Sequence, residues 1–336
     1  MATIKQIARK AGVSYSSVSR ALNGRPGVRP EVREKVLRLA RELNYHPHSS
    51  AKALVQNRIG VIGVVILRAS EFAFQNPYYS HMLLGIGSVG NQGGYHLMLD
   101  INPQGNYASL YHRRLVDGII VVANRIDDEY IPYLIKHKIP AVVVPGFPAG
   151  AELDIPSASS ENIKDVYRAV NYLISLGHRR IAFILGFMNS KYSIERLQAY
   201  KAAFKDNGLE YQEKYIKESD FSKADGYGLM GDLLELDQPP SAVICINDAV
   251  TPGALHQIHS RGLKIPDDIS VVAIGCSDLL ELTDPPLTTI KVPVVEVGRA
   301  AATNLIELIE KGRCQQKHVV IPTALVIRES TGVWRE

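Results

Sequence analysis

The chain has 336 residues, of which 46% are hydrophobic, and it carries a formal net charge of +4. A chain of this length is expected to divide into two or three domains. Its charge is uneven, because residues 1–58 hold 12 Lys and Arg against 3 Glu, whereas the remainder holds 26 against 31. A local excess of positive charge neutralises DNA phosphates, so the basic end is expected to bind nucleic acid.

The composition also excludes several classes of protein. The three cysteines are scattered and form no CxxC pair, so neither a disulfide framework nor a cysteine zinc site is expected. No apolar run is long enough to span a bilayer, and Met1 leads into a polar helix instead of a secretory signal. We therefore expect a cytoplasmic protein with no membrane partner, no metal and no cofactor.

Residues 3–24, TIKQIARKAGVSYSSVSRALNG, predict two short helices joined by a tight turn. Thr3 and Ser14 can cap the two helices, and Gly12 permits the left-handed backbone that ends the first. The second helix fits the DNA major groove, where hydroxyl groups position it on phosphates and an Arg can bond a guanine edge twice. The alternative is a surface helical hairpin without a DNA-binding role. The expected DNA contacts are Thr3, Ser14, Tyr15, Ser16, Ser19, Arg20 and Asn23.

A third helix is predicted to begin at Pro30, because proline suits a first helical position. Its apolar stripe would close an all-α helix-turn-helix DNA-binding domain over residues 1–46. The following segment, residues 47–58, contains Pro47 as a breaker and is too short to fold alone.

The sequence VSYSSVSRALNG closely resembles the recognition segment of the LacI/GalR family of bacterial transcription regulators. In that family the segment matching residues 47–58 becomes helical on DNA, pairs with its copy in a dimer, and pushes a Leu into the minor groove. Leu54 occupies that place here, with Lys52 where an Arg is more usual. The resemblance implies a DNA-contacting hinge with Leu54 as a wedge, and the alternative is a flexible linker with an incidental Leu.

From Arg58 the sequence changes to alternating strands and helices. IGVIGVVIL is a continuous apolar run, which is typical of a strand buried on both faces. Helix-length amphipathic stretches separate it from further candidate strands. These strands are HLMLDI, GIIVVA, AVVVP, RIAFILG, AVICIN and SVVAIG. They predict an α/β core with a parallel sheet over residues 59–336.

The phrases NPYYSHMLLGI, SLGHRRIAFILG and GLKIPDDISVVAIG resemble the effector-binding core of the same family, which is related to periplasmic sugar-binding proteins. The likeness implies a periplasmic-binding-protein-like (type I) core of two Rossmann-like subdomains. The first would span about 59–160 and 290–322, and the second about 161–289 and 323–336. Ligand would lie in the cleft between them, at the carboxyl ends of the strands.

The resemblance carries over to individual residues of this cleft. Tyr78 and Tyr79 match an aromatic pair at the cleft mouth, Arg196 matches a ligand-binding Arg, and Phe221 matches a ring that stacks on ligand. Asn247 and Asp248 match a polar pair at a strand end, where the amide can bond a hydroxyl and the Asp can instead cap the following helix. For each aromatic residue, ordinary core packing is the alternative.

The sequence departs from the family at two cleft positions. Pro145 and Gly275 stand where sugar-binding relatives often carry Asp, and Ser277 or Asp278 would substitute only if the loop shifts. Residues 101–115 are also more than a helical turn shorter than usual, which is expected to shorten one helix. The missing carboxylates favour a modified or anionic sugar, a nucleoside or another flat polar metabolite over a neutral hexose.

The sequence therefore predicts a homodimeric, sequence-specific transcription regulator, most simply a repressor, whose affinity for a near-palindromic operator depends on a small-molecule effector. No HExxH, GxSxG or P-loop motif occurs, so an enzyme is not expected. Two alternatives remain: control by a protein partner, as in the catabolite control branch of the family, and a solute-binding protein. The DNA-binding segment disfavours the second.

Overall fold

The computed structural model of the protein describes residues 3–22, 24, 26–45, 58–101, 105–123, 125–148 and 153–335. The chain forms two compact units, Met1–Gly60 and Val61–Glu336. Within the described ranges, no helix is long and apolar enough to cross a membrane.

Three helices form the described part of the first unit: α1 (Ile4–Ala11), α2 (Tyr15–Leu22) and α3 (Pro30–Glu42). As predicted, Thr3 caps α1, because its Oγ1 accepts from the Gln6 N–H at 3.3 Å and its own N–H donates to Gln6 Oε1 at 2.8 Å. Gly12 ends α1 with a φ of 69°, and the Ser14 hydroxyl accepts from the Ser17 N–H at 3.2 Å. The predicted apolar faces meet in one core, made of Ile7, Ala11, Val18, Ala21, Val36 and Ala40.

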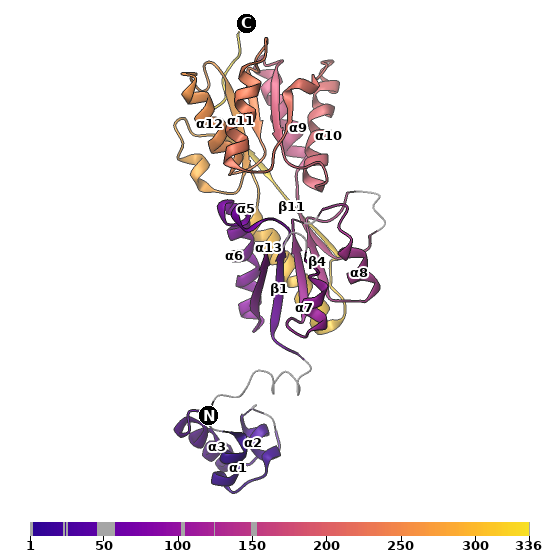
Figure 1. Ribbon diagram of the computed structural model, residues 1–336, viewed down its shortest axis with the longest axis vertical. Helices are drawn as coiled ribbons and strands as arrows, with labels where there is room; N and C mark the ends of the chain where they lie inside the picture. The colour runs from indigo at the N-terminus through magenta and orange to yellow at the C-terminus, as the bar shows by residue number, and fades with distance from the viewer. Residues whose placement is uncertain are drawn as a thin grey trace. The chain divides into compact units, whose positions relative to one another are not determined.

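The second unit contains two six-stranded sheets, each flanked by helices (Figure 1). The first sheet has the strand order β11-β5-β4-β3-β1-β2, and its neighbouring strands all pair in parallel. The strands are β1 (Val61–Ile66), β2 (His96–Ile101), β3 (Gly118–Val122), β4 (Ala141–Val144), β5 (Ser157–Glu161) and β11 (His318–Pro322).

Two long helices, α6 (Pro77–Gln92) and α13 (Val294–Lys311), pack together beside this first sheet (Figure 1). Their backbones touch, since a Cβ at Gly85 would lie only 2.1 Å from the Val295 carbonyl oxygen. The remaining helices of this half are short: α5 (Ser70–Gln75), α7 (Ala108–His112) and α8 (Tyr130–Lys136). The five-residue length of α7 agrees with the predicted shortening of this part of the chain.

The second sheet has the order β12-β10-β9-β8-β6-β7, and β12 alone pairs antiparallel, to β10. Its strands are β6 (Ile181–Leu185), β7 (Ile216–Glu218), β8 (Ala242–Cys245), β9 (Ser270–Gly275), β10 (Thr288–Lys291) and β12 (Ala324–Val326). Two helix pairs and two short 3-10 helices complete this half: α9 (Ile163–Ser175) with α10 (Lys191–Asp206), α11 (Lys223–Leu234) with α12 (Val250–Ser260), and η1 (Glu213–Tyr215) and η2 (Asp278–Glu281).

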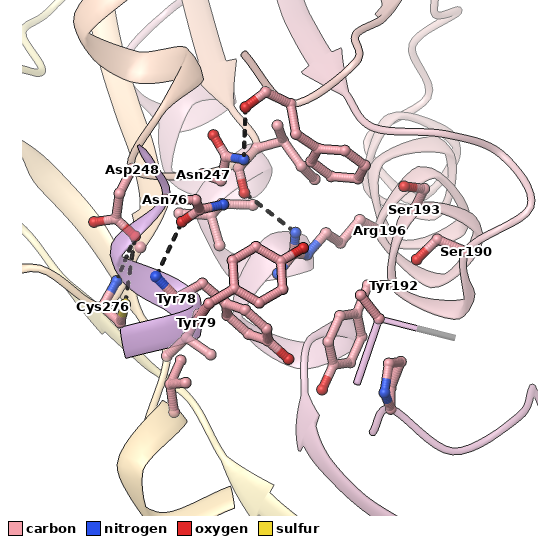
Figure 2. Close-up of a pocket in the computed structure, with 18 of the residues that line it drawn as sticks. Asn76, Tyr78, Tyr79, Ser190, Tyr192, Ser193, Arg196, Asn247, Asp248 and Cys276 are labelled. Atoms are coloured by element: carbon pink, nitrogen blue, oxygen red, sulfur yellow. Dashed lines mark hydrogen bonds between the residues drawn. The ribbon is translucent and has the colours of Figure 1, made fainter. Parts of the chain in front are cut away.

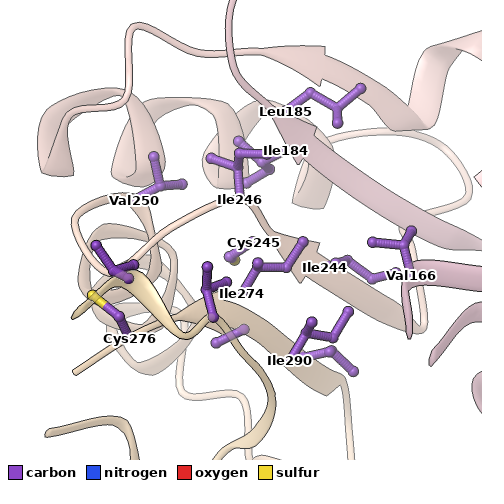
Figure 3. Close-up of a cluster of buried hydrophobic side chains, with 14 of the residues drawn as sticks. Val166, Ile184, Leu185, Ile244, Cys245, Ile246, Val250, Ile274, Cys276 and Ile290 are labelled. Atoms are coloured by element: carbon purple, nitrogen blue, oxygen red, sulfur yellow. The ribbon is translucent and has the colours of Figure 1, made fainter. Parts of the chain in front are cut away.

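The central strands are apolar on both faces, as their continuous hydrophobic runs predict. Ile184, Ile244, Ile274 and Ile290 come from four neighbouring strands of the second sheet, and all are buried (Figure 3). Helices therefore cover both faces of the sheet, and the carboxyl ends of the strands are left for binding.

The chain passes from the first sheet to the second after β5, returns after β10, and crosses again between β11 and β12. Three connections therefore join the two halves of the second unit. The residue limits expected for the domains and subdomains remain predictions.

Buried His178 fastens the C-terminal segment to the second sheet. Its Nε2 faces the Gly332 carbonyl oxygen at 3.1 Å and must carry the hydrogen, so Nδ1 accepts from the Ser241 hydroxyl at 2.8 Å. The ring also stacks on Trp334, whose N–H donates to the Leu176 carbonyl oxygen at 2.7 Å. Burial, and to a smaller extent the neighbouring Arg179 charge, lower the pKa of His178 from 6.5 to about 4.

Acid should therefore weaken the fold through His178. Below pH 6.5 the unfolded chain takes up a proton that the folded protein resists, so stability should fall as the pH drops from about 6.5 to about 4. His178→Gln should lower the melting temperature at pH 7.5 and flatten its dependence on pH across this window. The control is His96→Gln, at an exposed position on β2. Equal pH dependence in wild type and His178→Gln would contradict this account.

Candidate functional site

The predicted DNA-reading surface lies on α2. Tyr15, Ser16 and Arg20 are exposed, Ser19 is half-buried, and the opposite face of the helix enters the core of the first unit. The Ser14 hydroxyl, besides capping the helix, lies 2.8 Å from the Ser16 hydroxyl. Asn23, Lys52 and Leu54 lie outside the described residues. The role of each of these side chains on DNA remains a prediction.

A pocket in the second unit brings together the seven residues expected to contact ligand (Figure 2). Its walls come from both halves of the unit, and several of its residues directly follow strands, as expected for open parallel sheets. The predicted members are Tyr78, Tyr79, Arg196, Phe221, Asn247, Asp248 and Gly275, and Pro145 also lines the pocket. That these residues bind ligand remains a prediction.

Other lining residues were missed from the sequence: Arg68, Asn76, Ser190, Tyr192, Ser193 and Cys276. Two signals were available for them. Arg68 comes two residues after β1, and the carboxyl end of a parallel strand is where side chains meet a ligand. Tyr192 and Ser193 precede Arg196 by four and three residues, so they share its face of α10.

Arg196 is the most deeply buried charged residue of the pocket, with 6% of its surface exposed. Its NH1 donates to the Ile246 carbonyl oxygen at 3.2 Å, and its NH2 donates to Asn162 Oδ1 at 2.9 Å. Burial lowers its pKa to about 10, so the guanidinium stays charged at neutral pH. Its Nε is buried and has no hydrogen-bond partner. The guanidinium group of Arg196 is therefore fixed in place, and one of its N–H donors has no partner.

Phe221 is held in the left-handed backbone region, with a φ of 71°. Such a conformation is strained for a bulky residue and persists only where the surroundings enforce it. Here the Ser219 hydroxyl accepts from the Phe221 N–H at 3.3 Å, and the flanking N–H groups of Asp220 and Ser222 each donate to an Asp carboxylate at 2.8 Å. The ring packs over Gly186, where a Cβ would lie 1.9 Å from it.

The helix-capping role expected for Asp248 is taken by Asn247 in the structure. Asn247 Oδ1 caps α12 by accepting from the N–H groups of Ala249 at 3.0 Å and Val250 at 2.7 Å. Asp248 does not cap this helix, because its carboxylate accepts from the N–H groups of Cys276 at 3.0 Å and Ser277 at 2.9 Å. Both lining side chains are thus engaged by backbone N–H groups, which leaves less acceptor capacity for a ligand.

Asp248 also packs closely against the backbone at Gly275. A Cβ at Gly275 would lie 2.5 Å from Asp248 Oδ1 and 2.6 Å from Leu280 Cδ1, so no side chain fits there without movement. The prediction that Ser277 or Asp278 substitutes for the missing carboxylate is wrong, because neither residue lines the pocket. Ser277 caps η2 through the Leu279 N–H, and the exposed Asp278 pairs with Lys291 at 3.1 Å.

The phenol and thiol groups of the pocket are neutral. Tyr78 and Tyr79 meet edge to face, with ring centroids 5.3 Å apart, and burial raises the pKa of both phenols. Burial, reinforced by Asp248, likewise raises the pKa of the Cys276 thiol, so this sulfur is a poor nucleophile. The arrangement offers hydrogen-bond donors, stacking rings and a fixed cation, which suits binding and not covalent chemistry.

Residues 3–48 match the family described as bacterial regulatory proteins, lacI family, and residues 170–331 match a periplasmic binding protein-like domain. A relative, the HTH-type transcriptional repressor PurR of Vibrio atlanticus (strain LGP32), is 32% identical over 337 residues. That alignment covers 98% of this chain and 98% of the relative. The chain belongs to the LacI family.

Two solved structures of LacI-family regulators resemble this LacI-family chain over nearly its whole length. The Lac repressor dimer bound to operator and the anti-inducer ONPF has a TM-score of 0.86 at 27% identity, covering 98% of this chain and 99% of that one. The complex of the transcriptional regulator CelR with cellobiose has a TM-score of 0.74 at 30% identity, covering 98% and 100%. The protein is therefore a DNA-binding transcriptional regulator, and the relatives are regulators, not enzymes.

Arg20→Ala should weaken operator binding by roughly 1–3 kcal/mol and relax base preference, if Arg20 bonds a guanine edge twice. Fluorescence anisotropy would compare an operator, selected from a random duplex library, with unselected DNA at the same salt concentration. Arg38→Ala is the control, since Arg38 is an exposed residue of α3 that lies 3.8 Å from Glu42. An equal loss on both DNAs would show that Arg20 contacts only phosphate.

Gly275→Ala should destabilise the second unit by roughly 1–3 kcal/mol, because the new Cβ meets the Asp248 carboxylate. The cost should shrink in an Asp248→Ala background, which a double-mutant cycle in urea would measure. Gly228→Ala on α11 is the control, because no atom lies within 4 Å of its Cβ position. Additive effects of Gly275→Ala and Asp248→Ala would rule out this steric explanation.

Proposed function

We propose that this LacI-family regulator is a repressor that binds a near-palindromic operator as a homodimer in the cytoplasm. A small metabolite of the sugar, modified-sugar or nucleoside class binds the pocket and changes operator affinity. The observation that carries the proposal is the buried guanidinium of Arg196, whose Nε has no hydrogen-bond partner. This side chain lines a pocket together with aromatic rings. Such a group in a water-excluding site calls for a hydrogen-bonding ligand.

The pocket is also suited to regulation because its two walls belong to different halves of the unit. Tyr78 and Tyr79 come from α6 of the first half, whereas Arg196 and Phe221 come from the second half. A ligand that touches both walls binds more tightly when the halves are closed together, and so shifts the population toward that state. The three chain connections between the halves are the elements that would bend.

Exposed apolar side chains support the proposed dimer. Leu84 on α6 and Leu99 on the edge strand β2 are exposed, and Leu279 and Leu282 at η2 are exposed as well. Large apolar groups gathered on neighbouring elements mark protein interfaces more often than free surface. The Lac repressor structure that this chain resembles is described as a dimer on its operator. In the same proposal, Lys52 and Leu54 contact DNA between the two copies, and Thr3 and Ser14 contact phosphates.

The first experiment is a thermal-shift screen of the full-length protein against sugars, sugar phosphates, nucleosides and purines. A bound ligand raises the melting temperature, and each hit would then be titrated into the complex of protein and operator. Saturable binding that changes operator affinity supports the proposal. If no metabolite does so, control by a protein partner becomes the better account.

Arg196→Ala should abolish the response to such a metabolite, because it removes the only fixed cation of α10 in the pocket. Operator binding by the effector-free protein should persist, since the DNA-reading helix belongs to the other compact unit. Lys201→Ala, five residues further along the same helix and outside this pocket, is the matched control. An undiminished response in Arg196→Ala would show that the effector binds elsewhere.

A further inference from the structure

Arg68 is a second cation of the pocket, and it lies outside the sequence motifs that resemble the family. It lies between β1 and the short helix α5 and lines the pocket from the first half. Its guanidinium carbon lies 5.6 Å from the ring centroids of both Phe187 and Phe221, which belong to the second half. Its NH1 donates to the neighbouring Leu67 carbonyl oxygen at 2.9 Å. Arg68 is thus held against rings of the opposite wall.

No acidic side chain of the described residues forms an ion pair with Arg68 or Arg196. Asp248 is the one acid among the lining residues, and its two oxygens accept backbone N–H groups of the β9 loop. Burial lowers the pKa of Arg68, and the nearby Arg125 charge lowers it further. A buried cation without an anionic partner costs free energy, so a negative charge should be favourable in this pocket.

The pocket also contains hydrogen-bond donors without partners. Arg196 Nε and the Ser193 hydroxyl are buried and have no hydrogen-bond partner. Only 6% of the surface of Arg196 and 1% of the surface of Ser193 is exposed. The helices α6 and α10 begin directly after the lining residues Asn76 and Ser190, and α12 begins two residues after the lining residue Asp248. Helix N-termini carry partial positive charge, which adds to the field of the two guanidinium groups. An occupant rich in acceptor atoms therefore matches the site.

We propose that Arg68 is an anion-binding residue of the effector pocket, and that the effector carries a carboxylate or phosphate group. The guanidinium holds that group, while Phe221 and the tyrosine pair contact the remainder of the molecule. This assignment rests on the proposed function, in which the pocket binds the effector. It extends that function by naming the charge of the ligand and the residue that selects for it.

The competing account makes Arg68 a purely structural contact. A cation stacked on Phe187 and Phe221 joins the two halves of the unit, and such contacts stabilise proteins without any ligand. In that case Arg68→Gln lowers the melting temperature equally with and without an anion. The two accounts therefore differ in the effect of anions and not in the effect on stability alone.

The first test uses inorganic phosphate and acetate as probes on the full-length protein. Melting temperatures are measured in sodium phosphate, sodium acetate and sodium chloride at equal ionic strength, for wild type, Arg68→Gln and Arg68→Lys. The matched control is Arg125→Gln, which removes a nearby charge that does not line the pocket. Because phosphate stabilises many proteins by exclusion from their surface, only the difference between variants is informative.

We expect the gain in phosphate or acetate to be largest in wild type and Arg125→Gln, smaller in Arg68→Lys, and smallest in Arg68→Gln. A larger Arg68-dependent gain in melting temperature in phosphate than in acetate indicates a phosphorylated effector. A larger gain in acetate indicates a sugar acid or another carboxylate. Equal gains in all four proteins overturn the proposal and leave Arg68 as a structural contact.

The second test uses the metabolite that changes operator affinity. Its affinity should fall about 10- to 100-fold in Arg68→Gln, the range for losing a hydrogen bond to a charged group. A neutral metabolite that binds wild type and Arg68→Gln equally overturns this inference but leaves the proposed function intact. Conversely, Arg68-dependent stabilisation by phosphate, with no metabolite that alters operator binding, overturns the proposed function and supports the anion site.

Discussion

The pocket depends on the buried guanidinium of Arg196. Its two terminal nitrogens bond to the Ile246 carbonyl oxygen, directly after β8, and to Asn162, directly after β5. Asn162 lies where the chain first leaves one sheet for the other, so the same side chain fixes a strand end and a connection between the two halves. Because a buried charge requires partners, these bonds hold the pocket wall in one arrangement, and Nε alone has no partner.

Around this group the second half holds its side chains in place through local hydrogen bonds, whereas the first half supplies the opposite wall of the pocket. Phe221 keeps a strained backbone because four hydrogen bonds of its loop enforce it, and Gly186 leaves room for the ring. Arg68 and the tyrosine pair approach from the other half. A ligand that joins these two walls stabilises one relative position of the halves, which is the kind of coupling that regulation of DNA binding requires.

The fold was largely predictable because most of its strands are continuous apolar runs, and all seven strands predicted from such runs are present. Among the strands that were missed, β5 and β7 lack this signal. β5, with the sequence SASSE, is buried but polar, and its hydroxyls find specific partners: Ser159 accepts from the Gly146 N–H at 2.9 Å, and Ser157 bonds His318 at 3.0 Å. Those partners are distant in sequence, so no local pattern could reveal the strand.

The sequence by itself determined the three-helix unit and the parallel α/β core, because caps and apolar periodicity are local properties. The resemblance of its motifs to the family also indicated the seven residues that gather at one pocket. Tertiary structure alone decided what each polar group does there. Asn247 caps α12 in place of Asp248, because the Asp248 carboxylate accepts from N–H groups of the β9 loop and fills the space beside Gly275. Arg68 belongs to the site only because β1 and the Phe221 loop meet across the two halves, a contact between residues 153 positions apart in the chain.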